Sequence, residues 1–195
     1  YKDGDYKKAI VLGNKLLQIY AENDDCDCIE YAVDMSNLAM VFDRLQLYPQ
    51  AEKYYKQAAE LKKRCGGESL SYADTLNNLA IVYNQTNRQT EALRLHRKVM
   101  EIREAKLGRE HADFLHSLYH IGNTYELLGE YDKAIDYHAM ALRNNTFSTL
   151  ELADVHGALA RAYEAKGNYK KAIYYYEICL DLIEKARGCD TFYYM

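Results

Sequence analysis

Apolar and small side chains recur along the chain at helical spacing, and short polar segments interrupt them at regular intervals. Leu38 and Ala39 precede Phe42 by four and three residues, and the same spacing resumes at Ala51 and Tyr55 after the break LQLYPQ. Side chains at this spacing share one face of an α-helix. Corresponding breaks read QTNRQT, LGEYDK and KGNYKK. The pattern therefore predicts pairs of amphipathic helices, each pair joined by a short turn.

Four segments align with one another as MSNLAMVF, LNNLAIVY, LYHIGNTY and HGALARAY, which indicates an internal repeat. Each segment ends in an aromatic, with a small residue three positions before it and an alanine nine positions after it. These sets are Ala39, Phe42 and Ala51; Ala80, Tyr83 and Ala92; Gly122, Tyr125 and Ala134; and Ala160, Tyr163 and Ala172. Starting from Ala9 of the N-terminal GDYKKAI, the alanines follow one another at steps of 42, 41, 42 and 38 residues. Small residues let two helices cross closely, and the aromatics fill the space beside each crossing.

This arrangement resembles the tetratricopeptide repeat, TPR, and its longer period resembles the kinesin-light-chain type of that repeat. The segment from Leu76 to Asp113 carries the best match, although Ala112 stands where the family typically has proline. The resemblance implies an all-α fold, a right-handed superhelical solenoid of TPR-type helical hairpins. We predict a half repeat at 1–28, repeats at 29–69, 70–110, 111–148 and 149–188, and the start of a further repeat at 189–195. Because neither end shows a polar capping face, we expect a piece of a longer array.

Charge and composition narrow the classes of partner. The chain carries a formal net charge of −4, and no cluster of Lys and Arg stands apart from acidic neighbours, so we expect no nucleic-acid partner. No run of 18 apolar residues and no basic-then-apolar start are present, so we expect no membrane span and no signal peptide. The five cysteines are scattered and odd in number, which does not indicate a disulfide framework. We therefore expect a reducing, cytoplasmic setting.

The six histidines are the strongest candidates for chemistry. His116 and His120 lie four residues apart and share one helical face, but a metal site needs further ligands, and no HExxH motif is present. His96 and His138 occupy matching positions in successive second helices and are predicted to pack, while Asp113 is a plausible helix cap. No GxSxG motif, glycine-rich phosphate loop or nucleophilic-cysteine signature occurs. We expect no enzyme activity, no metal and no cofactor.

In the family that the chain resembles, the first helix of each hairpin lines a concave groove. The groove residues predicted from helical geometry are Asn37, Met40, Arg44, Asn77, Asn78, Ile81, Asn84, His116, Tyr119, His120, Asn123 and Arg161. Asparagine recurs in this set, and its amide can both donate to and accept from the backbone of an extended peptide. An alternative is that these asparagines bridge neighbouring repeats or remain solvated.

These observations predict a non-catalytic protein–protein interaction scaffold or adaptor that binds an extended or helical peptide segment in the concave groove. An alternative is the sensor or regulatory arm of a larger multidomain protein, whose effector or catalytic domain lies outside this sequence. A third possibility is self-association through uncapped ends. The groove face lacks the lysines that a clamp for a C-terminal carboxylate would require.

Overall fold

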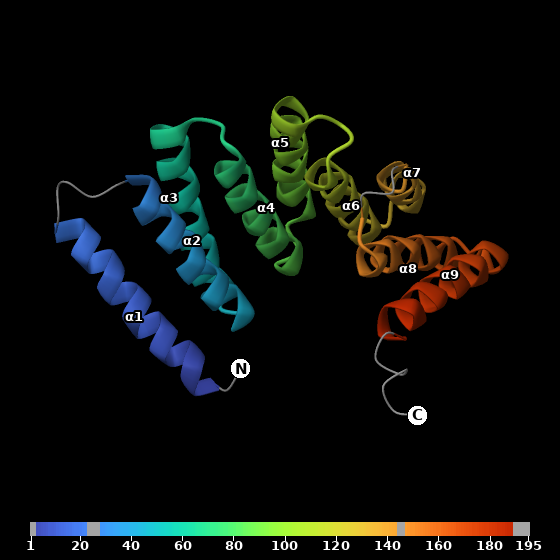
Figure 1. Cartoon of the computed structure of the whole chain (residues 1–195), viewed down its shortest axis with the longest axis horizontal. Coiled ribbons are helices and arrows are strands. Elements are labelled where there is room, and N and C mark those ends of the chain that lie inside the picture. The colour runs from blue at the N-terminus through green and yellow to red at the C-terminus, as the bar shows by residue number, and fades with distance from the viewer. Residues whose placement is uncertain (1–2, 23–27, 144–146, 189–195) are drawn as a thin grey trace. The chain divides into compact units, whose positions relative to one another are not determined.

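The computed structural model describes residues 3–22, 28–143 and 147–188. Throughout these ranges the secondary structure is helical, with no strand, which confirms the all-α class (Figure 1). The helices are α1 (Asp3–Glu22), α2 (Cys28–Arg44), α3 (Tyr48–Gly66), α4 (Leu70–Gln85), α5 (Gln89–Leu107), α6 (Ala112–Leu127), α7 (Tyr131–Ala141), α8 (Thr149–Ala165) and α9 (Tyr169–Arg187). They belong to two compact units, residues 1–102 and 103–195.

In the first unit, α2 and α3 form a hairpin, with α1 packed against α2 and α4 packed against α3. The predicted small residues lie in the core between these helices, since Ala39, Ala51, Ala80 and Ala92 are all fully buried. Tyr55 is 1% exposed in the same core. The pattern of small residues and aromatics thus positions the helices of this unit as predicted.

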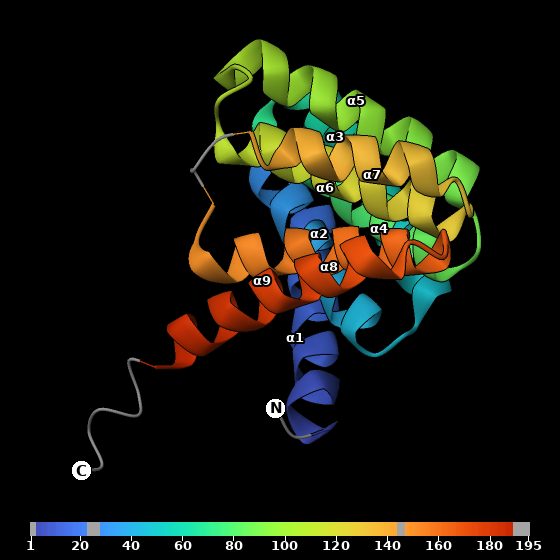
Figure 2. The same ribbon diagram turned by 90° about the vertical axis from the view of Figure 1, so that its right-hand side faces the viewer.

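In the second unit, α6 pairs with α7 and α8 with α9, and the members of each pair lie side by side in both views (Figure 1 and Figure 2). Gly122 takes the place of the small alanine found in the other hairpins. A Cβ atom on Gly122 would lie 2.5 Å from Cε1 of His138, whose imidazole is fully buried. The glycine is therefore required because the histidine ring packs directly on the α6 backbone.

Each turn within a hairpin contains one residue with positive φ at an equivalent position. These residues are Gln46 (φ 57°), Asn87 (φ 58°), Gly129 (φ 74°) and Gly167 (φ 74°). The left-handed conformation reverses the chain over very few residues, and glycine adopts it without steric cost. Pro49 lies in the first turn of α3, where its missing N–H has no intrahelical partner, as predicted.

Several helices begin with a side chain that accepts a backbone N–H. Ser69 accepts from Tyr72 N at 3.2 Å, and Ser148 forms a capping box with Glu151. The prediction that Asp113 caps α6 is wrong. The cap is His111, whose Nδ1 accepts from the backbone N of Asp113 at 3.1 Å. An imidazole nitrogen can replace the usual hydroxyl or carboxylate oxygen here, which sequence preferences do not indicate.

Cys28 and Cys65 form a disulfide, which the scattered and odd-numbered cysteines of the sequence did not indicate. Cys28 opens α2 and Cys65 lies in the last turn of α3, and the hairpin brings these two ends to a Cα–Cα distance of 6.5 Å. Their 37-residue separation is close to one repeat, and only the hairpin register reveals their proximity. Cys179 is a free, partly buried thiol. No helix in the described ranges is long and apolar enough to cross a membrane.

Candidate functional site

The first-helix face is the exposed side of α2 and α4 in the first unit, and of α6 and α8 in the second. In the first unit, α2 and α4 are in direct contact through the hydroxyls of Ser36 and Thr75, whose oxygens lie 3.2 Å apart. Asn37, Met40 and Arg44 are exposed on α2, with Met40 at 41%. This part of the face therefore offers an amide, a thioether and a guanidinium to the solvent.

On α4, the predicted residues differ in accessibility. Asn78, Ile81 and Asn84 are partly buried, whereas Asn77 is only 8% exposed. The expectation that Asn77 is exposed is wrong because Asn77 lies four residues after Ala73 and three before Ala80, both fully buried. It shares their face, and its Oδ1 has no hydrogen-bond partner among the described residues.

In the second unit, His116 bridges α6 to the start of α8. Its Nε2 lies 3.0 Å from Oε1 of Glu151, and its ring centroid lies 4.9 Å from that of Phe147. A small recess surrounds this pair, lined by His116, Tyr119, Phe147, Glu151, Asp154 and Val155. The carboxylate already occupies one nitrogen of His116, so the imidazole holds the two helices together.

Tyr119 and His120 lie on the same side of α6 and contact one another, with ring centroids 5.7 Å apart. The Tyr119 ring also lies 5.6 Å from that of His138. Burial, together with electrostatic interaction with His116 and Arg103, lowers the pKa of His120 to about 4. His120 is therefore a neutral, partly buried side chain near neutral pH.

A second bridge joins α6 and α8 through Arg161 and Glu126. Nε donates to Oε1 at 2.9 Å and Nη2 to Oε2 at 3.3 Å, so the guanidinium contacts both carboxylate oxygens. Nearby, Glu164 accepts a hydrogen bond from the Tyr176 hydroxyl at 2.7 Å. Asn123, also partly buried on α6, has an Oδ1 atom with no partner in the described part of the chain.

His116 and His120 do not belong to a cluster of metal ligands. Within the described ranges, no group of three or more His, Cys, Asp or Glu side chains gathers in a geometry that could hold a metal ion. His96 and His138 are fully buried, which confirms that they are packing residues. Burial and the charge of Arg161 lower the pKa of His138 to about 4.

A set of polar contacts between hairpins was not predicted. Lys62 of α3 donates to Thr75 Oγ1 of α4 at 2.8 Å, and Arg103 of α5 donates to Ser117 Oγ of α6 at 3.1 Å. Both cations are more than nine-tenths buried and stand eleven residues after a repeat alanine. The sequence signal for these contacts is the recurrence of a long polar residue at that position of the repeat.

Comparison with known proteins identifies the chain's relatives. Tetratricopeptide repeat models match residues 1–64, 44–105, 71–146 and 155–190. This chain belongs to the tetratricopeptide repeat family. The resemblance drawn from the small residues and aromatics is thus confirmed. TPR domains are generally protein-interaction modules and typically non-catalytic.

Solved structures share the fold at low sequence identity. BtubC (BKLC) from P. vanneervenii is 23% identical with a TM-score of 0.84, covering 95% of this chain and 76% of that one. The nearly identical TPR-like repeats of a kinesin-light-chain-type protein from Podosopora anserina are 21% identical with a TM-score of 0.76, covering 95% and 90%. MamA is 18% identical with a TM-score of 0.68, covering 95% and 92%. No curated protein sequence matches the chain.

Proposed function

We propose that this TPR domain is an interaction scaffold that binds an extended or helical segment of a partner protein along its first-helix face. The family supports this role, because TPR domains are generally protein-interaction modules. The observation that carries the proposal lies in the first unit. There α2 and α4 touch, and each keeps an asparagine at the same repeat position accessible, Asn37 and Asn78.

The asparagine amides would hold the backbone of the bound segment, because each can donate and accept a hydrogen bond whatever the partner's side chains. Met40 and Ile81, three residues after Asn37 and Asn78, would contact the partner's apolar side chains. The buried Lys62–Thr75 bond fixes α4 against α3 before binding. A preformed surface lowers the entropic cost of association.

The second unit would contribute a different set of contacts. Tyr119 offers an aromatic surface, His120 a neutral imidazole, and Asn123 a partly buried amide. His116 and Arg161 would support the face, because each already bonds to a carboxylate of the domain. Arg44 and Asn84 would lie at the margin of the face in the first unit, and the buried Asn77 is not part of the proposed contact.

The test is a quantitative pull-down from cell lysate with the wild type and an Asn78→Ala/Tyr119→Ala/Asn123→Ala variant. The matched control, Gln57→Ala/Glu60→Ala/Lys170→Ala, removes three exposed side chains from second helices. Circular dichroism establishes that all three proteins are folded. We expect the first variant alone to lose a specific partner, and titration with the captured protein should confirm the loss. Equal capture by all three proteins would place binding elsewhere.

A further inference from the structure

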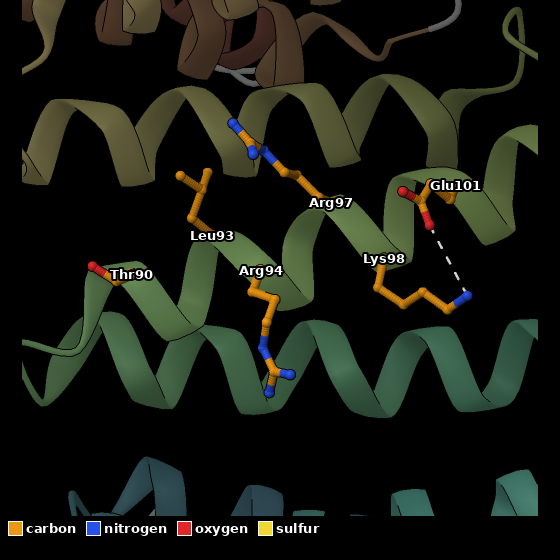
Figure 3. Close-up of a pocket in the computed structure, with 6 residues that line it drawn as sticks. All are labelled: Thr90, Leu93, Arg94, Arg97, Lys98 and Glu101. Atoms are coloured by element: carbon orange, nitrogen blue, oxygen red, sulfur yellow. Dashed lines mark ion pairs between the residues drawn. The ribbon is translucent and has the colours of Figure 1, made fainter.

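Each second helix has an outer stripe of six positions, counted from the alanine that recurs in every repeat. The positions lie two residues before this alanine and one, two, five, six and nine residues after it. The recurring alanines are Ala9, Ala51, Ala92, Ala134 and Ala172. In α5 the outer stripe comprises Thr90, Leu93, Arg94, Arg97, Lys98 and Glu101, which line an open recess (Figure 3). Three of the six are cations and one is a carboxylate. This surface lies on a different helix from the first-helix face and takes no part in the proposed function.

The same six positions differ in charge on the other second helices. In α3, α7 and α9 the cations do not outnumber the carboxylates. The residues are Pro49, Glu52, Lys53, Lys56, Gln57 and Glu60 in α3; Asp132, Ile135, Asp136, Ala139 and Met140 in α7, with Arg143 just beyond its end; and Lys170, Ile173, Tyr174, Glu177, Ile178 and Asp181 in α9. In α1 the stripe holds two lysines, Lys7 and Lys15, eight residues apart. Among the outer stripes of the described helices, only that of α5 holds three cations, and these lie within a span of five residues.

The cations of the α5 stripe differ in the ion pairs that they form. Lys98 lies 2.8 Å from Glu68 and 4.0 Å from Glu101, so carboxylates of the domain neutralise much of its charge. Arg94 is exposed and forms no ion pair with any described residue. Figure 3 shows the Arg94 and Arg97 side chains leaving the helix in opposite directions, with Leu93 on the side of Arg97. The recess therefore has a guanidinium on each side and an apolar residue beside one of them.

We propose that the outer stripe of α5 is a second docking surface, which binds an acidic segment of a protein partner. Guanidinium groups bind carboxylates in a two-pronged geometry, so Arg94 and Arg97 would hold two acidic side chains, and Leu93 would contact an intervening apolar side chain. The stripe carries an excess of positive charge on a chain whose net charge is −4, so an acidic segment is attracted to this stripe and not to the surface as a whole. A nucleic acid requires a longer basic track than three cations flanked by Glu68 and Glu101.

Fluorescence anisotropy with a labelled octaglutamate peptide tests the proposal, with octaglutamine and a single-stranded oligothymidine of eight nucleotides as comparison probes. The wild type is measured beside Arg94→Glu/Arg97→Glu and the milder Arg94→Gln/Arg97→Gln. The matched control is Lys53→Glu/Lys170→Glu, which reverses two outer-stripe cations on other helices and changes the net charge equally. Circular dichroism verifies that every variant is folded.

We expect octaglutamate to bind the wild type more tightly than either comparison probe, and more weakly as the ionic strength rises. Both α5 variants should weaken binding by about tenfold or more, and the control by less than about twofold. Equal weakening by the control would overturn the proposal, because only the overall charge would then matter. Absence of octaglutamate binding at low ionic strength, or tighter binding of the oligothymidine, would also overturn it. None of these results depends on the first-helix face.

Discussion

The two units connect their first helices by different chemistry. In the first unit, α2 and α4 meet through two neutral hydroxyls, Ser36 and Thr75. In the second unit, α6 and α8 are joined by the pairs His116–Glu151 and Arg161–Glu126. The amide and apolar side chains of the first unit consequently remain available to a partner, whereas part of the polar surface of the second unit is used internally. The same fold thus joins its first helices through neutral hydroxyls in one unit and through ion pairs in the other.

The first unit also contains a covalent link for which the described part of the second unit has no counterpart. Reducing the Cys28–Cys65 disulfide should lower the stability of the first unit by about 4 kcal/mol, as expected for a closed loop of this size. Hydrogen exchange read peptide by peptide should show faster exchange in α2 and α3 after reduction, with α6 to α9 unchanged. Cys28→Ala/Cys65→Ala should reproduce the effect and Cys179→Ala should not. Unchanged exchange in α2 and α3 would contradict this prediction.

Packing around Gly122 sharpens the comparison, because the first unit has alanines at the equivalent positions. Gly122→Ala should destabilise the second unit by roughly 1–3 kcal/mol, since the new methyl group overlaps the buried His138 ring. Urea denaturation measures the loss. In the Gly122→Ala/His138→Ala double variant, the cost should be smaller than the sum of the two single costs, because the overlap is gone. Additive costs would show that the methyl group is accommodated in another way.

Acid should weaken the second unit through His138. Its pKa is about 4 in the fold and near 6.5 when unfolded, so above about pH 6.5 both states are neutral and the group has no effect. As the pH falls from about 6.5 to 4, the unfolded state binds the proton first, and stability should fall by roughly 1 kcal/mol per pH unit. Urea denaturation at several pH values measures this slope. His138→Phe should have a shallower slope, and an equal slope in both proteins would exclude His138 as the source.

The smallest expected effects come from the contacts between first helices. Arg161→Gln and Ser36→Ala should each cost about 0.5–1 kcal/mol, because the Arg161 side chain of the ion pair is about half exposed and the hydroxyl contact is a single hydrogen bond. The two variants should respond differently to salt. At about 1 M ionic strength the cost of Arg161→Gln should largely disappear, while that of Ser36→Ala should persist. If both variants responded equally to salt, the contrast between an ionic contact in the second unit and a neutral contact in the first would be wrong.

The sequence predicts the fold of this chain well because the decisive residues act locally. Ala51 and Ala92 must be small wherever two helices cross, and their spacing alone reveals the hairpins. The first-helix face is predicted less well, because exposure depends on the exact rotation of each helix against its neighbours. Asn77 and Asn78 are adjacent in sequence, yet only Asn77 is buried with the alanines.

Pairings between distant residues were the least predictable. The packing of the helices brings Lys62 to its acceptor Thr75 and Cys28 to Cys65. Sequence spacing shows that such residues recur, but not which neighbour each one reaches.

The polar contacts between hairpins have a consequence for how such a domain evolves by duplication and exchange of repeats. At the same position of successive junctions, Tyr20 donates to Asp34, Lys62 to Thr75 and Arg103 to Ser117. The equivalent residue of α8 is Val155, which offers no acceptor. A transplanted repeat that placed such a valine against Lys62 would remove the closer of its two acceptors and leave the buried ammonium group with a backbone carbonyl at 3.4 Å, at a cost of about 1–3 kcal/mol. Each repeat therefore packs well only beside a repeat that supplies a matching residue, so duplication or exchange of repeats has to preserve these pairings.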